Sequence, residues 1–93
     1  YYSVSLAEGY YRAGNHQEGD AILKEMSDNN LKELKYYTSL PSRYDNYAVD
    51  EINRNLAIYM EIGKMAKKHN RTELMQTMED DYQASVKALQ RFQ

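Results

Sequence analysis

The sequence predicts an all-α fold, and three of its features support this prediction. Gly and Pro, which mark the frequent turns of many-stranded proteins, number only 4 and 1 among the 93 residues. Apolar residues recur every three or four positions along most of the chain, which is the period of an α-helix. Short segments rich in Gly, Asn and Pro divide this pattern into four expected helices, at about residues 3–13, 16–39, 47–69 and 71–92.

The first expected helix places Leu6 and Tyr10 one helical turn apart. Gly14 ends it, because glycine readily adopts the left-handed conformation found at helix C-termini. Asn15 is expected to cap the next helix, with Glu18 three residues further on in a variant of the capping box. Since this turn is short, the first two helices are expected to be antiparallel neighbours.

The second expected helix, residues 16–39, contains an Asn pair that leaves two interpretations open. Asn29-Asn30 favours an interruption, whereas Asp28 and Lys32, an acid-to-base pair at a spacing of four, favour continuation. We predict one long helix, either straight or kinked at Asn29-Asn30. Leu40-Pro41 ends it, because the residue before a proline avoids the helical region.

The third and fourth expected helices form a second hairpin. The third has apolar or small residues at spacings of four, three, four and three: Ile52, Leu56, Tyr59, Gly63 and Ala66. The fourth begins after Asn70, with Glu73 three residues further on. Asn15 and Asn70, 55 positions apart, therefore mark matching turns of a duplicated hairpin. One hairpin alone would expose its apolar face. The two antiparallel hairpins are therefore expected to stack on each other, in a single domain over residues 1–93.

Composition excludes several classes of function. Twelve Lys and Arg against 14 Asp and Glu give a net charge of −2, so no basic field is available to hold nucleic acid. The absence of Cys removes disulfides, thiolate catalysis and Cys-based zinc sites. The mean hydropathy is −0.89, and no apolar run approaches the ~20 residues of a membrane span. The segment is therefore expected to have neither a nucleic-acid partner nor a membrane span.

Enzyme and metal motifs are absent from the sequence. It has no Gly-rich phosphate loop, no nucleophile elbow and no HExxH spacing. His16 and His69 lie beside the expected turns, with only Glu18 or Glu73 nearby as further ligands, and are interpreted as polar helix ends. No catalytic residue, metal or cofactor is predicted.

Tyrosine is unusually abundant, with 10 residues, and several occur in adjacent pairs. Adjacent helix positions differ by ~100°, so one interpretation places one member of each pair in the core and the other at its edge. The other interpretation is a groove that stacks on sugar rings or grips a peptide. The candidate interaction residues are Tyr2, Leu6, Tyr10, Tyr11, Tyr36, Tyr44 and Tyr47.

The first hairpin, over about residues 3–26, resembles a tetratricopeptide repeat. The motif residues are Leu6 and Ala7 at its Leu-Gly pair, Tyr10 at its aromatic position, Gly14 at its turn, Gly19 at its small packing position and Leu23 at its large apolar position. Ser3 departs from the usual bulky aromatic residue, and Leu31 stands where a closing proline is common. The resemblance implies a right-handed array of stacked hairpins, although the second hairpin matches the pattern only loosely.

The stretches LAEGYYRAGN, KELKYYTSLP and LAIYMEIGKMAKKHN resemble the C-terminal region of a family of bacterial multi-spanning membrane proteins. The N-terminal part of that family is similar to membrane-embedded glycosyltransferases that act on lipid-linked sugars. The resemblance implies that this chain is a piece of a longer membrane protein, its extracytoplasmic (periplasmic) soluble tail. It carries no catalytic residue into this segment.

Together these features predict a non-catalytic protein-interaction or scaffolding module, with a protein, a peptide or other domains of the parent chain as partner. The favoured contact surface is the first helix, which is expected to expose apolar area and to form a homodimer. The alternative is a sugar- or glycolipid-recognising accessory domain that uses the tyrosines between Tyr36 and Tyr47, around Pro41. A third interpretation is a freestanding, self-assembling bundle.

Overall fold

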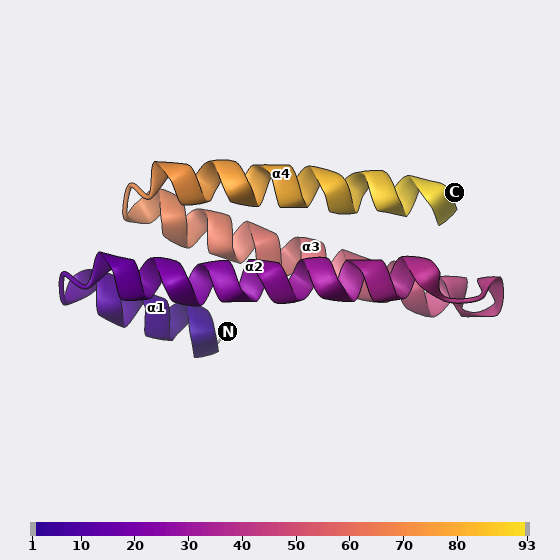
Figure 1. Cartoon of the computed structure of the whole chain (residues 1–93), viewed down its shortest axis with the longest axis horizontal. Coiled ribbons are helices and arrows are strands. Elements are labelled where there is room, and N and C mark those ends of the chain that lie inside the picture. Colours follow the sequence, from indigo (N-terminus) through magenta and orange to yellow (C-terminus); the bar gives the residue numbers. More distant parts are fainter. Residues whose placement is uncertain (1, 93) are drawn as a thin grey trace.

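A computed structural model describes residues 2–92, and these residues form helices and turns with no β-strand. The four α-helices are α1 (Tyr2–Arg12), α2 (His16–Ser39), α3 (Asp45–Lys68) and α4 (Thr72–Leu89) (Figure 1). Two short 3-10 helices accompany them, η1 (Ser42–Tyr44) and η2 (Gln90–Phe92). The predicted all-α class and its four helices are confirmed. No helix within residues 2–92 is long and apolar enough to cross a membrane.

The long second helix is continuous. It runs from His16 to Ser39 and passes through Asn29-Asn30 without interruption. Asn30 is buried, and its side-chain amide donates a hydrogen bond to the main-chain carbonyl of Asn55 in α3 at 3.5 Å. This amide therefore has a tertiary partner, so it does not compete with the helix for local backbone groups.

The turn between α1 and α2 and the turn between α3 and α4 have the same backbone geometry. The amide of Asn15 donates to the carbonyl of Tyr10 at 2.8 Å, and the amide of Arg71 donates to the carbonyl of Ala66 at the same distance. Both turns thus end a helix with the 6→1 hydrogen bond of a Schellman motif, in which an amide donates to the carbonyl five residues earlier. The two motifs lie 56 residues apart, at positions 15 and 71.

The left-handed residue of each turn fixes the register of this repeat. Gly14 has φ 86° and Asn70 has φ 58°, so Asn70 is the counterpart of Gly14. The prediction that Asn70 matches Asn15 was wrong by one residue. The predicted capping role was wrong as well, because the side chain of Asn15 makes no capping hydrogen bond and the capping position before α4 is Arg71. Asn mimics Gly here because its short polar side chain tolerates the left-handed region.

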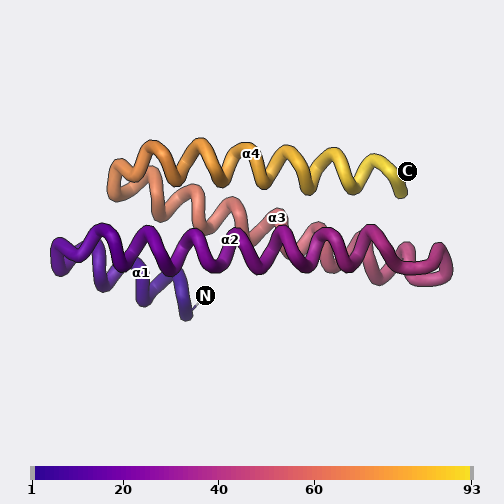
Figure 2. Tube along the Cα trace, in the orientation of Figure 1, coloured from indigo at the N-terminus to yellow at the C-terminus, as the bar shows by residue number. Residues whose placement is uncertain are grey.

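The helices form an elongated body of 47 × 21 × 15 Å. The short α1 lies beside the first part of α2, and α4 follows α3 through the second tight turn (Figures 1 and 2). α2 also contacts both α3 and α4, and α1 contacts α3. α3 is thus packed against all three other helices.

The apolar core has two parts separated by a polar layer. The larger part gathers near the tight turns and contains Val4, Ala7, Tyr11, Leu23, Tyr59, Ile62, Ala66, Leu74 and Met78. The smaller part lies toward the opposite end of α2 and contains Leu34, Tyr37, Ala48 and Ile52. Between them along α2, α3 and α4 lie the buried polar residues Ser27, Asn30, Asn55 and Ser85. Ser27 donates to the carboxylate of Asp81, and Asn55 returns the hydrogen bond of Asn30 at 3.5 Å.

The buried face of α3 agrees only in part with the one that its apolar spacing predicted. Leu56 and Gly63 were expected on this face, but both are only partly buried. The fully buried neighbours are Asn55 and Ile62, each one position earlier. Ile52, Tyr59 and Ala66 are buried as predicted, so the face is only shifted toward Asn55 and Ile62. Asn55 pairs there with the buried Asn30 of α2.

Candidate functional site

The predicted contact surface on α1 is divided between solvent and core. Tyr2 and Leu6 are exposed, at 81% and 41% of their surface, and Tyr10 is half-buried. Tyr11 is only 3% exposed. We therefore correct the predicted surface by removing Tyr11, which faces the core because it lies ~100° around the helix from Tyr10.

Tyr11 sits where α1, α2 and the second turn meet. Its hydroxyl donates to Asp20 Oδ1 at 2.7 Å, and its ring stacks on that of His69 with the centroids 4.8 Å apart. Its ring also lies directly over Gly19, where an added Cβ would come within 2.5 Å of a ring carbon. Burial, reinforced by the Asp20 carboxylate, raises the pKa of Tyr11 well above its usual range.

Asp20 joins the two tight turns. Arg71 donates to it from both Nε and Nη2, at 2.9 Å to Oδ1 and 2.7 Å to Oδ2, which is a bidentate pair. The Arg71 guanidinium and the Tyr11 hydroxyl hold the pKa of Asp20 below its ordinary value. Arg71 Nη1 also lies 3.1 Å from His16 Nδ1. The residues at the turns therefore tie the two helix pairs together.

Glu8 forms a second polar link, between α1 and the end of α3. Its carboxylate lies 2.8 Å from Lys68 Nζ and 3.2 Å from His69 Nε2, and Arg12 Nη2 approaches it at 3.2 Å. Hydrogen bonds from Lys68 and His69 lower the pKa of Glu8 from 4.5 to about 2.

The two histidines are used in these contacts. His69 contacts Glu8 and Tyr11, and His16 contacts Arg71 and packs edge-on against Tyr11 at 5.9 Å. Within residues 2–92, no group of three or more His, Asp or Glu side chains is placed to hold a metal ion. The sequence did not reveal the contacts of His69 with Glu8 or of Arg71 with Asp20 and His16, because these partners are 51 to 61 residues apart in the chain.

The tyrosines around Pro41 gather at the other end of the molecule. Tyr36, Tyr44 and Tyr47, together with Leu40, line one open hollow of about 460 Å³. All three tyrosines are exposed, at 57%, 42% and 48% of their surface. This hollow, the tyrosine hollow, brings together the three residues that the sequence singled out in this region.

Tyr37 packs against two of the tyrosines that line the tyrosine hollow. It is 7% exposed and meets the rings of Tyr36 and Tyr47 edge-on, at 5.5 Å and 5.8 Å between centroids. Its hydroxyl donates to Glu33 Oε2 at 3.3 Å, and burial, followed by nearby carboxylates, raises its pKa to about 12. The guanidinium of Arg43 lies 4.8 Å from the centre of the Tyr44 ring. The hollow therefore offers flat aromatic surface with hydroxyl and cationic groups beside it.

Comparisons of the chain with protein families, curated proteins and solved structures found no match. The chemistry of α1 and of the tyrosine hollow is therefore judged from geometry and charge.

Proposed function

We propose that this chain is a non-catalytic protein-interaction or scaffolding module, built as a tetratricopeptide-like right-handed array of two stacked hairpins. Three observations support the array. The two tight turns share one backbone geometry, α2 contacts both helices of the second pair, and the small residues Ala7 and Gly19 are buried where helices meet. Small residues at such positions let helix backbones approach closely, as the repeat pattern requires. The turns lie 56 residues apart, which exceeds the ~34 residues of a tetratricopeptide repeat.

The main support for an interaction role is that α1 has apolar side chains on both its buried and its exposed side. This helix buries Val4 and Ala7 against the core and turns Tyr2 and Leu6 to the solvent. Large apolar side chains on the solvent side of an edge helix are typical of contact surfaces. We take the occupant of this surface to be the α1 helix of a second copy, because a twofold axis would bring the same apolar patch of both copies together.

Sedimentation equilibrium of the whole chain over a wide concentration range tests this dimer. The wild-type chain is expected to double in mass, and the variant with Tyr2→Ser and Leu6→Glu is expected to stay monomeric, because the glutamate would be desolvated in the contact. The matched control, Tyr36→Ser with Met60→Glu, makes the same chemical changes on other surfaces and should dimerise as wild type does. A chain that is monomeric throughout, or a control as defective as the α1 variant, would contradict the proposed surface.

We further propose that the module is the extracytoplasmic, periplasmic tail of a membrane protein related to glycosyltransferases that act on lipid-linked sugars. The three stretches quoted above support this placement, and catalysis would belong to the membrane part of the parent chain. The full reading frame tests it most simply. Multiple membrane spans upstream of Tyr2 support the tail, and a parent without spans contradicts it.

The tyrosine hollow favours a second candidate function, recognition of a sugar or glycolipid headgroup. Three exposed tyrosines that line one hollow meet the geometric requirement for stacking on sugar rings, which dispersed tyrosines would not. Titration of the whole chain with neutral oligosaccharides, followed by NMR, should shift signals of Tyr36, Tyr44 and Tyr47. Tyr44→Ala should abolish these shifts, whereas Tyr2→Ala, which removes an exposed ring from α1, should leave them intact. Shifts that survive Tyr44→Ala, or none at all, would reject sugar recognition.

A further inference from the structure

The internal repeat relates two surfaces of the molecule, one covered and one open. Four backbone hydrogen bonds of the first turn recur in the second turn at a spacing of 56 residues. The first joins Ala13 to Gly9 and corresponds to the bond between His69 and Met65. The last joins Gly19 to Asn15 and corresponds to the bond between Met75 and Arg71. Each residue of the α1–α2 pair near its turn therefore has a counterpart 56 positions later in the α3–α4 pair. This register shows which parts of the two pairs are equivalent.

On the first pair, the surface around Val4, Ala7 and Glu8 is covered by α3. Val4 and Ala7 are 7% and 0% exposed and share a core cluster with residues of α3. Glu8 meets Lys68 at the end of α3, at 2.8 Å. The carboxylate on this surface thus finds its positive partner on the helix that covers it.

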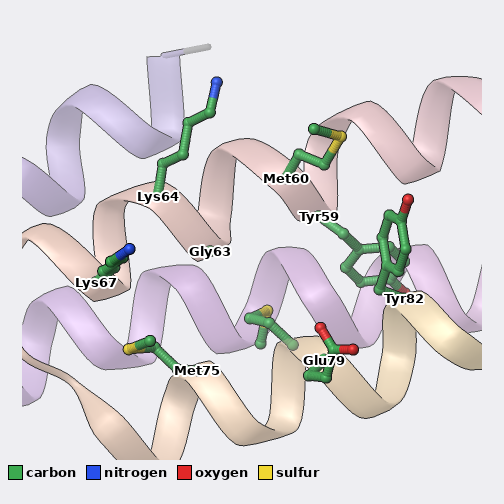
Figure 3. A pocket seen from close by; sticks show the side chains of 9 residues that line it. Tyr59, Met60, Gly63, Lys64, Lys67, Met75, Glu79 and Tyr82 are labelled. Carbon is green, nitrogen blue, oxygen red and sulfur yellow. The ribbon is translucent and has the colours of Figure 1, made fainter.

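On the second pair, the counterparts of these residues line an open groove, the α3–α4 groove (Figure 3). Val4, Ala7, Glu8 and Tyr11 correspond to Met60, Gly63, Lys64 and Lys67. Met75, Glu79 and Tyr82 of α4 form the other side, and the groove measures about 340 Å³. Met60 is 52% exposed, whereas its counterpart Val4 is 7% exposed. The groove therefore occupies the place that α3 covers on the first pair.

The charge on the α3 side of the groove is opposite to that of the covered surface. Glu8 is replaced by Lys64, and the neutral Tyr11 by Lys67. Lys64 Nζ lies 3.5 Å from Glu61 Oε1, an exposed pair within one helix that contributes little and competes weakly with a partner. On the α4 side, Glu79 accepts a hydrogen bond from Gln83 at 3.0 Å. An occupant therefore meets positive charge along α3 and a carboxylate along α4.

We propose that the α3–α4 groove binds an amphipathic helix of a partner protein, with its apolar stripe against Met60 and Tyr82 and its carboxylates toward Lys64 and Lys67. Helices dock in such grooves through apolar residues one turn apart, and the flanking charges select among them. This inference rests on the proposed function, since it assigns a second surface and a partner chemistry to the same interaction module. The groove lies on α3 and α4, so it is separate from the exposed side chains of α1.

The segment that covers the equivalent surface supplies a probe. A synthetic peptide of residues 45–70 with Lys68→Glu and His69→Glu carries the apolar face of α3 and places carboxylates where Lys64 is expected to meet them. A control peptide with Asn53→Glu and Arg54→Glu makes a similar change of net charge on exposed positions at the other end. Titrations of the whole chain, followed by NMR, should give an affinity about tenfold higher for the first peptide, with shifts centred on Met60, Gly63 and Tyr82.

A charge exchange on the protein completes the test. Lys64→Glu with Lys67→Glu should weaken binding of the first peptide about tenfold, and the matched variant Lys32→Glu with Lys35→Glu, exposed on α2, should leave it within about twofold. Equal affinity for the two peptides, shifts on α1 instead of the groove, or no binding would overturn the inference. Loss of self-association in the Lys64 and Lys67 variant would also overturn it, because the occupant would then be a second copy. Sedimentation of the variant with Tyr2→Ser and Leu6→Glu tests the α1 dimer, whereas the peptide titrations test binding in the groove. Failure of one proposal is therefore distinguishable from failure of the other.

Discussion

At the scale of single residues, the contact between Tyr11 and Gly19 sets how closely α1 approaches α2. The Tyr11 ring cannot move freely, because its hydroxyl is bonded to Asp20 and its face is stacked on His69. Ala at position 19 would place a Cβ within 2.5 Å of this ring. The small residue that the repeat pattern favours at this position therefore has a steric reason in this chain.

Gly19→Ala is expected to lower the free energy of unfolding by about 1–3 kcal/mol, because the ring must shift within a packed core. Gly9→Ala, on the exposed side of α1 with no atom within 4 Å of the added Cβ, should raise it by about 0.5–1 kcal/mol. Urea denaturation of both variants measures these changes. Equal effects of the same sign would show that Tyr11 does not lie over Gly19.

The pKa of Glu8 makes a prediction about acid stability. Its pKa of about 2 in the folded chain lies below the ordinary 4.5, so its ion pairs stabilise the fold above pH 4.5. This stabilisation is lost as the pH falls from 4.5 toward 2. Glu8→Gln should therefore be less stable than wild type at pH 7, and the difference should shrink toward pH 2. Thermal unfolding across this range measures it, with Glu25→Gln, an exposed side chain of α2, as the control that should follow wild type.

Sequence reasoning succeeded at residues whose role is local and failed where the partner is distant. For Tyr10-Tyr11 and Tyr36-Tyr37, one of the two interpretations placed one member of the pair in the core. Tyr11 and Tyr37 are indeed buried, which follows from helix geometry alone. Sequence reasoning listed Tyr11 as a contact residue all the same, because nothing local indicates that Asp20 and His69 surround it. The tyrosine hollow was found because its residues are close in the chain, whereas the α3–α4 groove joins Met60 to Tyr82 across a turn, so no local pattern defines it.

At the scale of helices and turns, the two tight turns place different residues at the same left-handed position. Gly14 and Asn70 both adopt positive φ, and an added Cβ on Gly14 meets no atom within 4 Å. A substitution of Gly14 therefore changes backbone strain without changing packing. The shared position was misassigned from sequence because Asn15 and Asn70 look alike, although Asn serves as readily in the left-handed position as at a helix N-terminus.

Gly14→Ala is expected to cost about 1–2 kcal/mol of stability, because a side chain with Cβ is strained in the left-handed region. Asn70→Gly should instead keep or raise stability, by at most about 1 kcal/mol, since glycine adopts the observed φ without strain. Denaturant midpoints of both variants measure the effects. A loss of stability in Asn70→Gly would indicate that the Asn70 side chain has a further role.

The end of α2 followed from local chemistry, whereas the full buried face of α3 did not. The end of α2 at Ser39, just before Leu40-Pro41, is where the proline restriction places it. The buried face of α3 includes Asn55, whose reciprocal hydrogen bonds with Asn30 an apolar periodicity leaves out. Buried polar pairs of this kind specify how helices are registered against one another.

At the scale of the whole molecule, the position of α3 determines which surfaces are open. It covers the first helix pair, where Glu8 and Tyr11 receive Lys68 and His69, and leaves the equivalent surface of the second pair as a groove. The remaining apolar exposure lies on α1 and in the tyrosine hollow. The α3–α4 groove therefore depends on this one packing arrangement.

The most direct test of this arrangement is a nuclear Overhauser experiment on the whole chain in solution. The rings of Tyr11 and His69 stack with centroids 4.8 Å apart although they are far apart in sequence, so cross-peaks between their protons are expected. Cross-peaks between these rings, with none joining the Met60 methyl group to α1 or α2, would support a covered first pair and an open second pair. Absence of the contact between Tyr11 and His69, or contacts from Met60 to α1, would contradict it.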